Sequence, residues 1–199
     1  MGERMKRFKG LRGMAVFLVL LCMLAGYYFY LSNRSDRGEE EMETTKVQEV
    51  LLRDLTRNYP ASPKEVLRYY SEILQCMYNE DCTEEELEQL ANRAMEICDE
   101  ELVSYQSEEF ISRLKEDVQA YKDQNVQISS YKTSNSTDVD YFTKDGRECA
   151  RLYCTYTLRV RTSLQALDEI FIMRKDEEGH WKILGWDEAD PEKKQATGE

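Results

Sequence analysis

The chain has 199 residues, which is enough for one domain after a targeting segment. Its formal net charge is −12, but the charge is unevenly divided: the first 37 residues hold seven Lys or Arg against two Asp or Glu, and the rest of the chain holds 20 against 37. An acidic domain without a basic stripe repels phosphate backbones, so nucleic acid is excluded as an expected partner.

Residues 13–31 form an uncharged apolar segment. At a rise of about 1.5 Å per residue, a helix of this length spans the roughly 30 Å hydrocarbon layer of a membrane. Five basic residues precede it, so the positive-inside rule places residues 1–12 in the cytoplasm and the following domain outside the cell. The sequence predicts a single-pass protein of the cell membrane whose residues 13–31 contact the lipid bilayer.

A cleaved signal peptide is the alternative interpretation of this segment. Signal peptides have a shorter apolar core, about 7–15 residues, that ends in a small-x-small cleavage site. Here Ala25 and Gly26 lie inside the apolar run, and the bulky residues Tyr27 and Tyr28 follow them. We therefore expect the segment to be retained as an anchor.

The polar residues 32–43 predict a juxtamembrane linker, and the extracytoplasmic domain is expected over residues 44–188. Apolar residues at helical spacing between Val47 and Leu55 predict a short first helix. Residues 189–199 are predicted to form a flexible tail.

Two helix-start signatures follow the first helix. Ser62 and Thr83 are each followed three residues later by a Glu, which is the pattern of a capping box. Apolar residues continue at helical spacing from Thr83 to Leu102, which predicts one helix over that range. A third amphipathic pattern begins at Ser107, so we expect three successive helices that each cover an apolar surface.

The hydrophobic period then changes from 3.6 to 2, which predicts strands. The dipeptide Asp145-Gly146 predicts a hairpin turn, because both residues tolerate positive φ. The expected strands cover residues 126–129, 138–141, 149–161, 167–175 and 181–186. Together they predict a curved antiparallel sheet and an α+β fold class.

The order of helices followed by a meander resembles the nuclear transport factor 2-like superfold over residues 62–188, and residues 178–183 (EGHWKI) resemble its closing hairpin. The resemblance implies a cone in which about three helices pack on a curved antiparallel sheet. Residues 58–60 (NYP), 76–80 (CMYNE) and 99–102 (DEEL) are similar to an uncharacterised family of membrane-anchored proteins of Gram-positive bacteria. That similarity implies fold and topology and transfers no catalytic residue.

The sequence offers few candidates for chemistry. His180 is the only histidine and is expected at a surface turn, so we predict no catalytic residue, no cofactor site and no metal site. Some members of the superfold are isomerases or dehydratases with an acid inside the cone. Glu169 is the alternative cavity acid here, because it shares strand parity with Phe171 and Met173, and burial would raise its pKa.

Cys76 and Cys82 flank the break between two predicted helices. A six-residue separation at such a break can bring two sulfurs within bonding reach, so a local disulfide is a hypothesis that fits an extracytoplasmic domain. Closing so small a loop would contribute about 2 kcal/mol.

These features favour a non-catalytic binding or interaction module at the cell envelope, with another envelope protein, a peptide or a small apolar ligand as its partner. The alternative is an isomerase or lyase that uses a buried carboxylate, and a self-associating spacer is a third possibility. An enzyme would need a cavity of a few hundred Å³ that contains an acid with a tyrosine or water partner.

Overall fold

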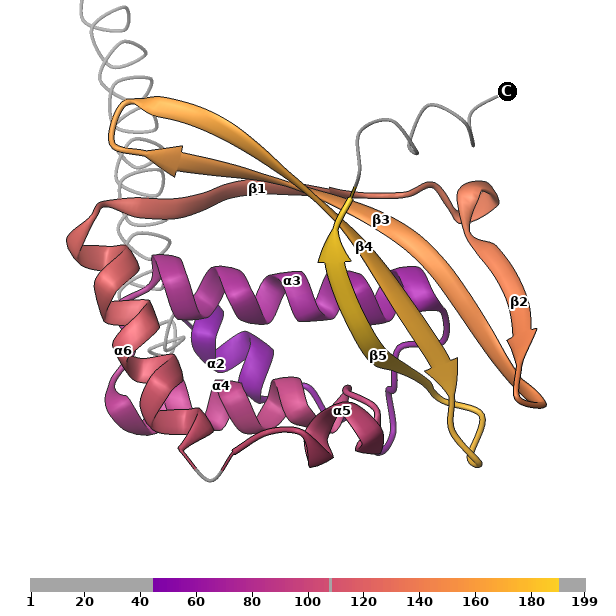
Figure 1. Cartoon of the computed structure of the whole chain (residues 1–199). Helices are drawn as coiled ribbons and strands as arrows, with labels where there is room; N and C mark the ends of the chain where they lie inside the picture. Colours follow the sequence, from indigo (N-terminus) through magenta and orange to yellow (C-terminus); the bar gives the residue numbers. More distant parts are fainter. Residues whose placement is uncertain (1–44, 108, 190–199) are drawn as a thin grey trace, which may run out of the picture. The chain divides into compact units, whose positions relative to one another are not determined.

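The computed structural model describes residues 45–107 and 109–189 (Figure 1). They form an α+β domain in which five α-helices accompany a five-stranded antiparallel sheet. The predicted basic tail, anchor and linker, and the last ten residues, lie outside this range. Within the range, every helix is too short or too polar to cross a bilayer.

The helices precede the sheet along the chain. They are α2 (Lys46–Leu51), α3 (Pro63–Asn79), α4 (Glu84–Glu96), α5 (Glu100–Ser104) and α6 (Phe110–Asp123). The strands are β1 (Val126–Thr133), β2 (Asp140–Lys144), β3 (Arg147–Val160), β4 (Ser163–Lys175) and β5 (Trp181–Glu188), with a short 3₁₀ turn at Ser136–Asp138. The sheet order is β1-β3-β4-β5, and β2 pairs with the first part of β3.

Both predicted helix starts are confirmed. The Ser62 hydroxyl accepts a hydrogen bond from the backbone N–H of Glu65, and Pro63 occupies the first position of α3. At α4 the capping box is complete, because Thr83 accepts from the Glu86 N–H and the Glu86 carboxylate accepts from the Thr83 N–H.

The single helix predicted from Thr83 to Leu102 is wrong in extent, since α4 ends at Glu96 and α5 begins at Glu100. The chain between them extends along β5: the Asp99 N–H donates to the Ile183 carbonyl (2.8 Å) and the Ile183 N–H donates to the Ile97 carbonyl (2.9 Å). These long-range backbone bonds replace the helical ones over this segment.

A long hairpin of β3 and β4 is the main element of the sheet. The two strands pair continuously from Cys149–Arg174 to Val160–Ser163, so β4 begins four residues before the predicted strand. The predicted turn is confirmed, with φ of 53° at Asp145 and 77° at Gly146.

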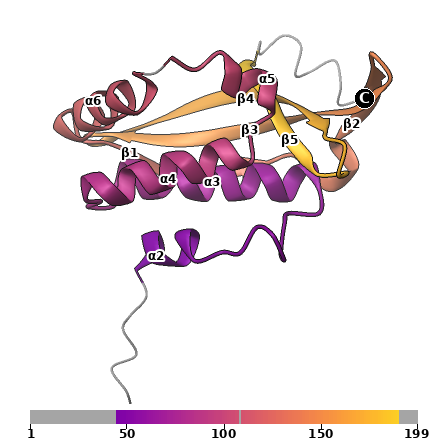
Figure 2. The same cartoon turned by 90° about the horizontal axis from the view of Figure 1, so that it is seen from below.

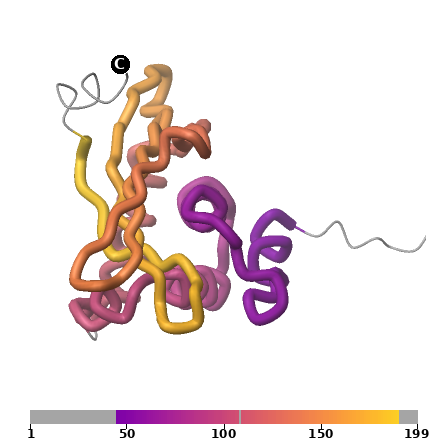
Figure 3. The backbone as a smooth tube through the Cα atoms, turned by 90° about the vertical axis from the view of Figure 1, so that its right-hand side faces the viewer, coloured from indigo at the N-terminus to yellow at the C-terminus, as the bar shows by residue number. Residues whose placement is uncertain are grey.

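Helix α3 lies between the sheet and α2 (Figures 2 and 3). Its residues Val66, Leu67 and Ile73 are fully buried. The Ser71 hydroxyl donates to the Leu67 carbonyl and therefore accepts from the Tyr156 hydroxyl on β3 (2.9 Å). The helix is thus joined to the sheet by apolar packing and by one buried hydrogen bond.

The substitution Leu152→Ala tests whether the core residues on the sheet stabilise the folded domain. Leu152 on β3 is 0% exposed, so we expect the free energy of unfolding to fall by about 2–5 kcal/mol, measured by urea denaturation. Leu164→Ala on β4 is the matched control, because Leu164 is 64% exposed and its loss should change the value by less than about 0.5 kcal/mol. Equal effects of the two substitutions would contradict the assignment of the core.

Candidate functional site

A cavity of about 210 Å³ lies between α3, α6 and the sheet. Its lining is mostly aromatic and aliphatic, with a single carboxylate. The lining residues are Tyr70, Leu74, Tyr78, Tyr121, Val126, Gln127, Ile128, Tyr156, Leu158, Leu167, Glu169 and Trp186. We call it the first cavity.

The side chains that line the first cavity come together because they are regularly spaced along each helix and strand. On α3, Tyr70, Leu74 and Tyr78 follow one another at four-residue intervals and so lie on one helix face. On β4, Leu167 and Glu169 are two residues apart and point to the same side of the sheet. The site is therefore assembled from the helix period and the strand period together.

A second cavity of about 180 Å³ shares the wall formed by Tyr70, Leu74, Tyr78 and Trp186. Its other lining residues come from α3 to α6 and are mostly apolar: Met77, Ala91, Ala94, Met95, Cys98, Leu102, Val103, Gln106, Phe110 and Leu114. Two larger depressions, of about 750 and 990 Å³, are lined mainly by charged and polar residues. Small-molecule sites are mostly apolar with few polar groups, so the first cavity is the stronger candidate.

Glu169 is half-buried in the wall of the first cavity. Desolvation raises the pKa of its carboxyl group. Among the described residues no side chain forms a hydrogen bond or an ion pair with this carboxylate. Within the described residues, Glu169 is consequently a polar group without a partner.

The tyrosines of the site are neutral hydroxyl donors. Desolvation raises the pKa of Tyr70, Tyr78 and Tyr156 above the usual value near 10, so all three stay protonated at neutral pH. The Tyr156 hydroxyl already bonds to Ser71. No hydrogen bond joins Glu169 to a tyrosine in the described part of the chain, but the charge of Glu169 contributes, after desolvation, to the raised pKa of Tyr70, so these two groups are neighbours.

Aromatic rings also form the rim of the first cavity. Tyr121 is 44% exposed and Trp186 is 43% exposed. The Tyr121 ring meets Tyr78 edge-on at 5.2 Å between centroids, and the Trp186 ring lies 5.8 Å from Tyr70. The sequence identified Glu169 by its strand parity, whereas no local pattern in it marked Trp186 as a residue of the site.

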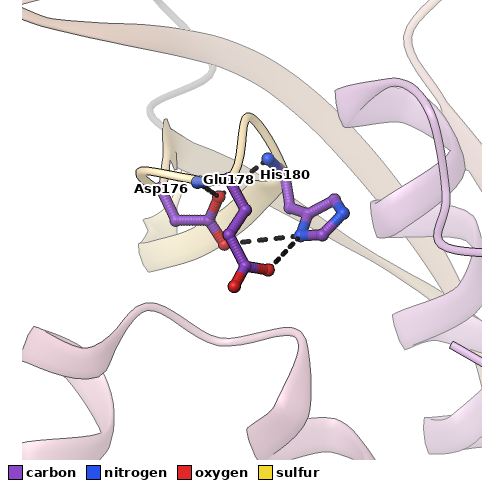
Figure 4. Close-up of side chains that lie close together, drawn as sticks. All are labelled: Asp176, Glu178 and His180. Atoms are coloured by element: carbon purple, nitrogen blue, oxygen red, sulfur yellow. Dashed lines mark hydrogen bonds and ion pairs between the residues drawn. The ribbon is translucent and has the colours of Figure 1, made fainter. Parts of the chain in front are cut away.

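His180 lies on the turn between β4 and β5, outside both cavities, as expected from the sequence (Figure 4). Its Nδ1 is 3.3 Å from a Glu178 carboxylate oxygen and 3.7 Å from one of Asp176. These three side chains are close enough to hold a metal ion. The turn also uses them, because Asp176 accepts backbone N–H bonds from Glu178 and His180.

Cys76 and Cys82 are both free thiols in the structure. The Cys82 thiol donates to the Cys76 carbonyl (3.4 Å), and desolvation raises the pKa of Cys76 to about 11. The proposed disulfide between them stays a prediction.

An ion pair that the sequence did not reveal lies beside the second cavity. Arg174 on β4 donates two hydrogen bonds to the Asp99 carboxylate, one of them from Nε at 2.9 Å, and its Nη1 is 3.0 Å from Glu101. Asp99 also caps α5 by accepting from the Glu101 N–H. The pair fixes the segment that covers the edge of β5.

Lowering the pH should weaken the ion pair between Asp99 and Arg174. Burial raises the pKa of Asp99, but the hydrogen bonds from Arg174 and Glu101 outweigh it and leave the pKa lowered. Such a carboxylate stabilises the fold above its unfolded pKa of about 3.9, and that contribution is lost as pH falls through the folded pKa. We expect Asp99→Asn to cost about 3 kcal/mol at pH 7 in urea denaturation, and progressively less below pH 4.

Asp117→Asn on the exposed side of α6 is the control and should change the free energy of unfolding by less than about 0.5 kcal/mol at either pH. A cost of Asp99→Asn that does not depend on pH would show that the ionised pair contributes nothing.

Residues 1–186 match a family described as a domain of unknown function, DUF6715. Because the match covers nearly the whole chain, the chain belongs to this family. No curated protein matches the chain.

Proposed function

We propose that this chain is a membrane-anchored protein whose extracytoplasmic domain is a non-catalytic module that binds a small, largely apolar ligand in the first cavity. The observation that carries the proposal is the cavity itself, with its apolar lining, its one carboxylate and its rim of exposed aromatic rings. Such a lining favours burial of an apolar body and provides few groups for chemistry.

We further propose that the domain is a nuclear transport factor 2-like cone. A long bent hairpin facing a central helix, followed by the closing β4–β5 hairpin, supports this assignment. The Tyr59 hydroxyl donates to the Trp181 carbonyl (2.8 Å), which ties the closing hairpin to the segment before α3.

One observation favours the isomerase or lyase alternative, namely an acid of raised pKa inside the cavity. Proton transfer would still require a second group within hydrogen-bond reach of the same substrate atom. Tyr70 is a candidate, because it lines the same cavity and the charge of Glu169 acts on it, but no hydrogen bond joins the two among the described residues, so we favour binding.

The ligand site can be tested with 1-hexanol as a neutral apolar probe. Leu74 lies on the wall shared by both cavities, so Leu74→Phe should fill the first cavity and weaken binding by at least about tenfold. Isothermal titration of the full chain in detergent, corrected for protein-free detergent, measures the effect. Leu164→Phe, at an exposed position outside the cavities, should bind like the parent chain; equal affinity of all three chains would reject the site.

The anchor and its orientation follow from residues 13–31 and from the basic residues before them. Protease added to intact cells should therefore digest the acidic domain without lysis, as seen with an antibody against the domain. A cytoplasmic protein of the same cells serves as the control and should survive. Digestion of the domain only after lysis would overturn the proposed topology.

A further inference from the structure

We propose that the first cavity selects an organic ammonium ion with a short alkyl chain, with the cationic head beside Glu169 and the tyrosine rings. This inference rests on the proposed ligand site and specifies the chemical class of the ligand. It follows from three features of the described residues, namely an unpartnered carboxylate, an aromatic wall and the absence of basic residues from the lining.

The carboxylate is the first feature. Glu169 faces the first cavity and has no hydrogen-bond or ion-pair partner in the described range. In the sheet it stands directly opposite Glu188 of β5, whose side chain is exposed. A cation bound at this position would restore the interactions that Glu169 loses on burial.

The aromatic wall is the second feature. Five of the twelve lining residues are aromatic: Tyr70, Tyr78, Tyr121, Tyr156 and Trp186. Their rings come from α3, α6, β3 and β5, so they approach the cavity from several directions. Rings that surround a small space attract an organic cation through their negative faces, and this arrangement recognises substituted ammonium groups.

The rest of the lining agrees with this ligand class. Among the described residues, no lysine, arginine or histidine lines the first cavity, so none of them competes for Glu169. Leu74, Leu158 and Leu167 provide an apolar surface for an alkyl chain. A neutral apolar ligand would use that surface but would leave the carboxylate desolvated without a partner, whereas an anion would be repelled by it.

The test compares hexylamine, which is protonated at pH 7, with 1-hexanol, which has the same chain and no charge. In isothermal titration of the full chain we expect hexylamine to bind about tenfold more tightly, as a charged hydrogen bond and cation–π contacts would give. Glu169→Gln keeps the shape of the side chain and should reduce the ratio of the two affinities to about threefold, which the cation–π contacts maintain, while hexanol binds at least as tightly as it does to the parent chain. Glu116→Gln, at an exposed position of α6, is the matched control and should keep the tenfold ratio.

Tyr121→Leu tests the contribution of the aromatic wall to cation binding. Tyr121 is on the rim, so its loss should not unfold the domain. We expect it to weaken hexylamine several-fold more than hexanol, while Tyr141→Leu, at an exposed position that does not line the cavity, changes neither. Equal affinities of the two probes for the parent chain, or a preference that Glu169→Gln leaves undiminished, would overturn the cation selectivity proposed for Glu169 and leave the ligand site standing. Failure of both probes to bind would reject the ligand site itself.

Discussion

Helix α3 is covered on opposite sides, and the rest of the domain is arranged to cover it. The Tyr69 hydroxyl donates to the Val50 carbonyl of α2, while the next residue, Tyr70, packs against Phe171 and Trp186 of the sheet. Ser71 is a buried polar residue of this helix and must be satisfied internally, and its bonds to Leu67 and Tyr156 do so. The long β3–β4 hairpin supplies enough strand length to cover one side of the helix, and α2 covers the other.

This arrangement also explains where the two cavities form. The shared wall of Tyr70, Leu74 and Tyr78 belongs to the same helix, at the end nearer α6. Buried residues extend along the whole helix, from Val66 and Leu67 to Ile73 and Met77. The cavities therefore form along one face of α3, while its other buried side chains are densely packed.

Local signals in the sequence were enough to predict the elements, and long-range contacts decided where they stop. The helix caps at Ser62 and Thr83 each depend on only four neighbouring residues. A local sequence pattern is therefore sufficient to predict them, and both are confirmed. The break before α5 depends on backbone bonds to Ile183 and on the pairing of Asp99 with Arg174, 75 residues away, which no local pattern contains. The first four residues of β4, 163–166, were missed because all of them are exposed, so they have no buried face that would reveal a strand.

In the candidate site too, some features follow from local sequence signals and others only from long-range contacts. Strand parity alone placed Glu169 with Phe171, but the aromatic wall unites residues from four elements that are distant in the sequence. A tyrosine considered on its own strand or helix therefore gives no sign that it belongs to the site. Their meeting point could be known only after the helix period and the sheet register were combined in three dimensions.

The net negative charge of the domain and the Glu169 carboxylate in the first cavity both attract cations, but over different distances. Residues 38–199 carry 37 acidic against 20 basic side chains, which attracts any cation toward the surface, but salt screens that attraction beyond about 8–10 Å. A field of this kind cannot distinguish an organic ammonium ion from a metal ion. Discrimination requires contacts inside the cavity, where Glu169 is partly withdrawn from water and aromatic rings face the ligand. A strongly hydrated metal ion would have to give up its water shell there for one carboxylate and rings of low polarity, whereas an alkylammonium ion gains contacts along its whole length. The general charge of the domain can thus raise the local concentration of cations, and the unpartnered carboxylate in an aromatic wall can select among them.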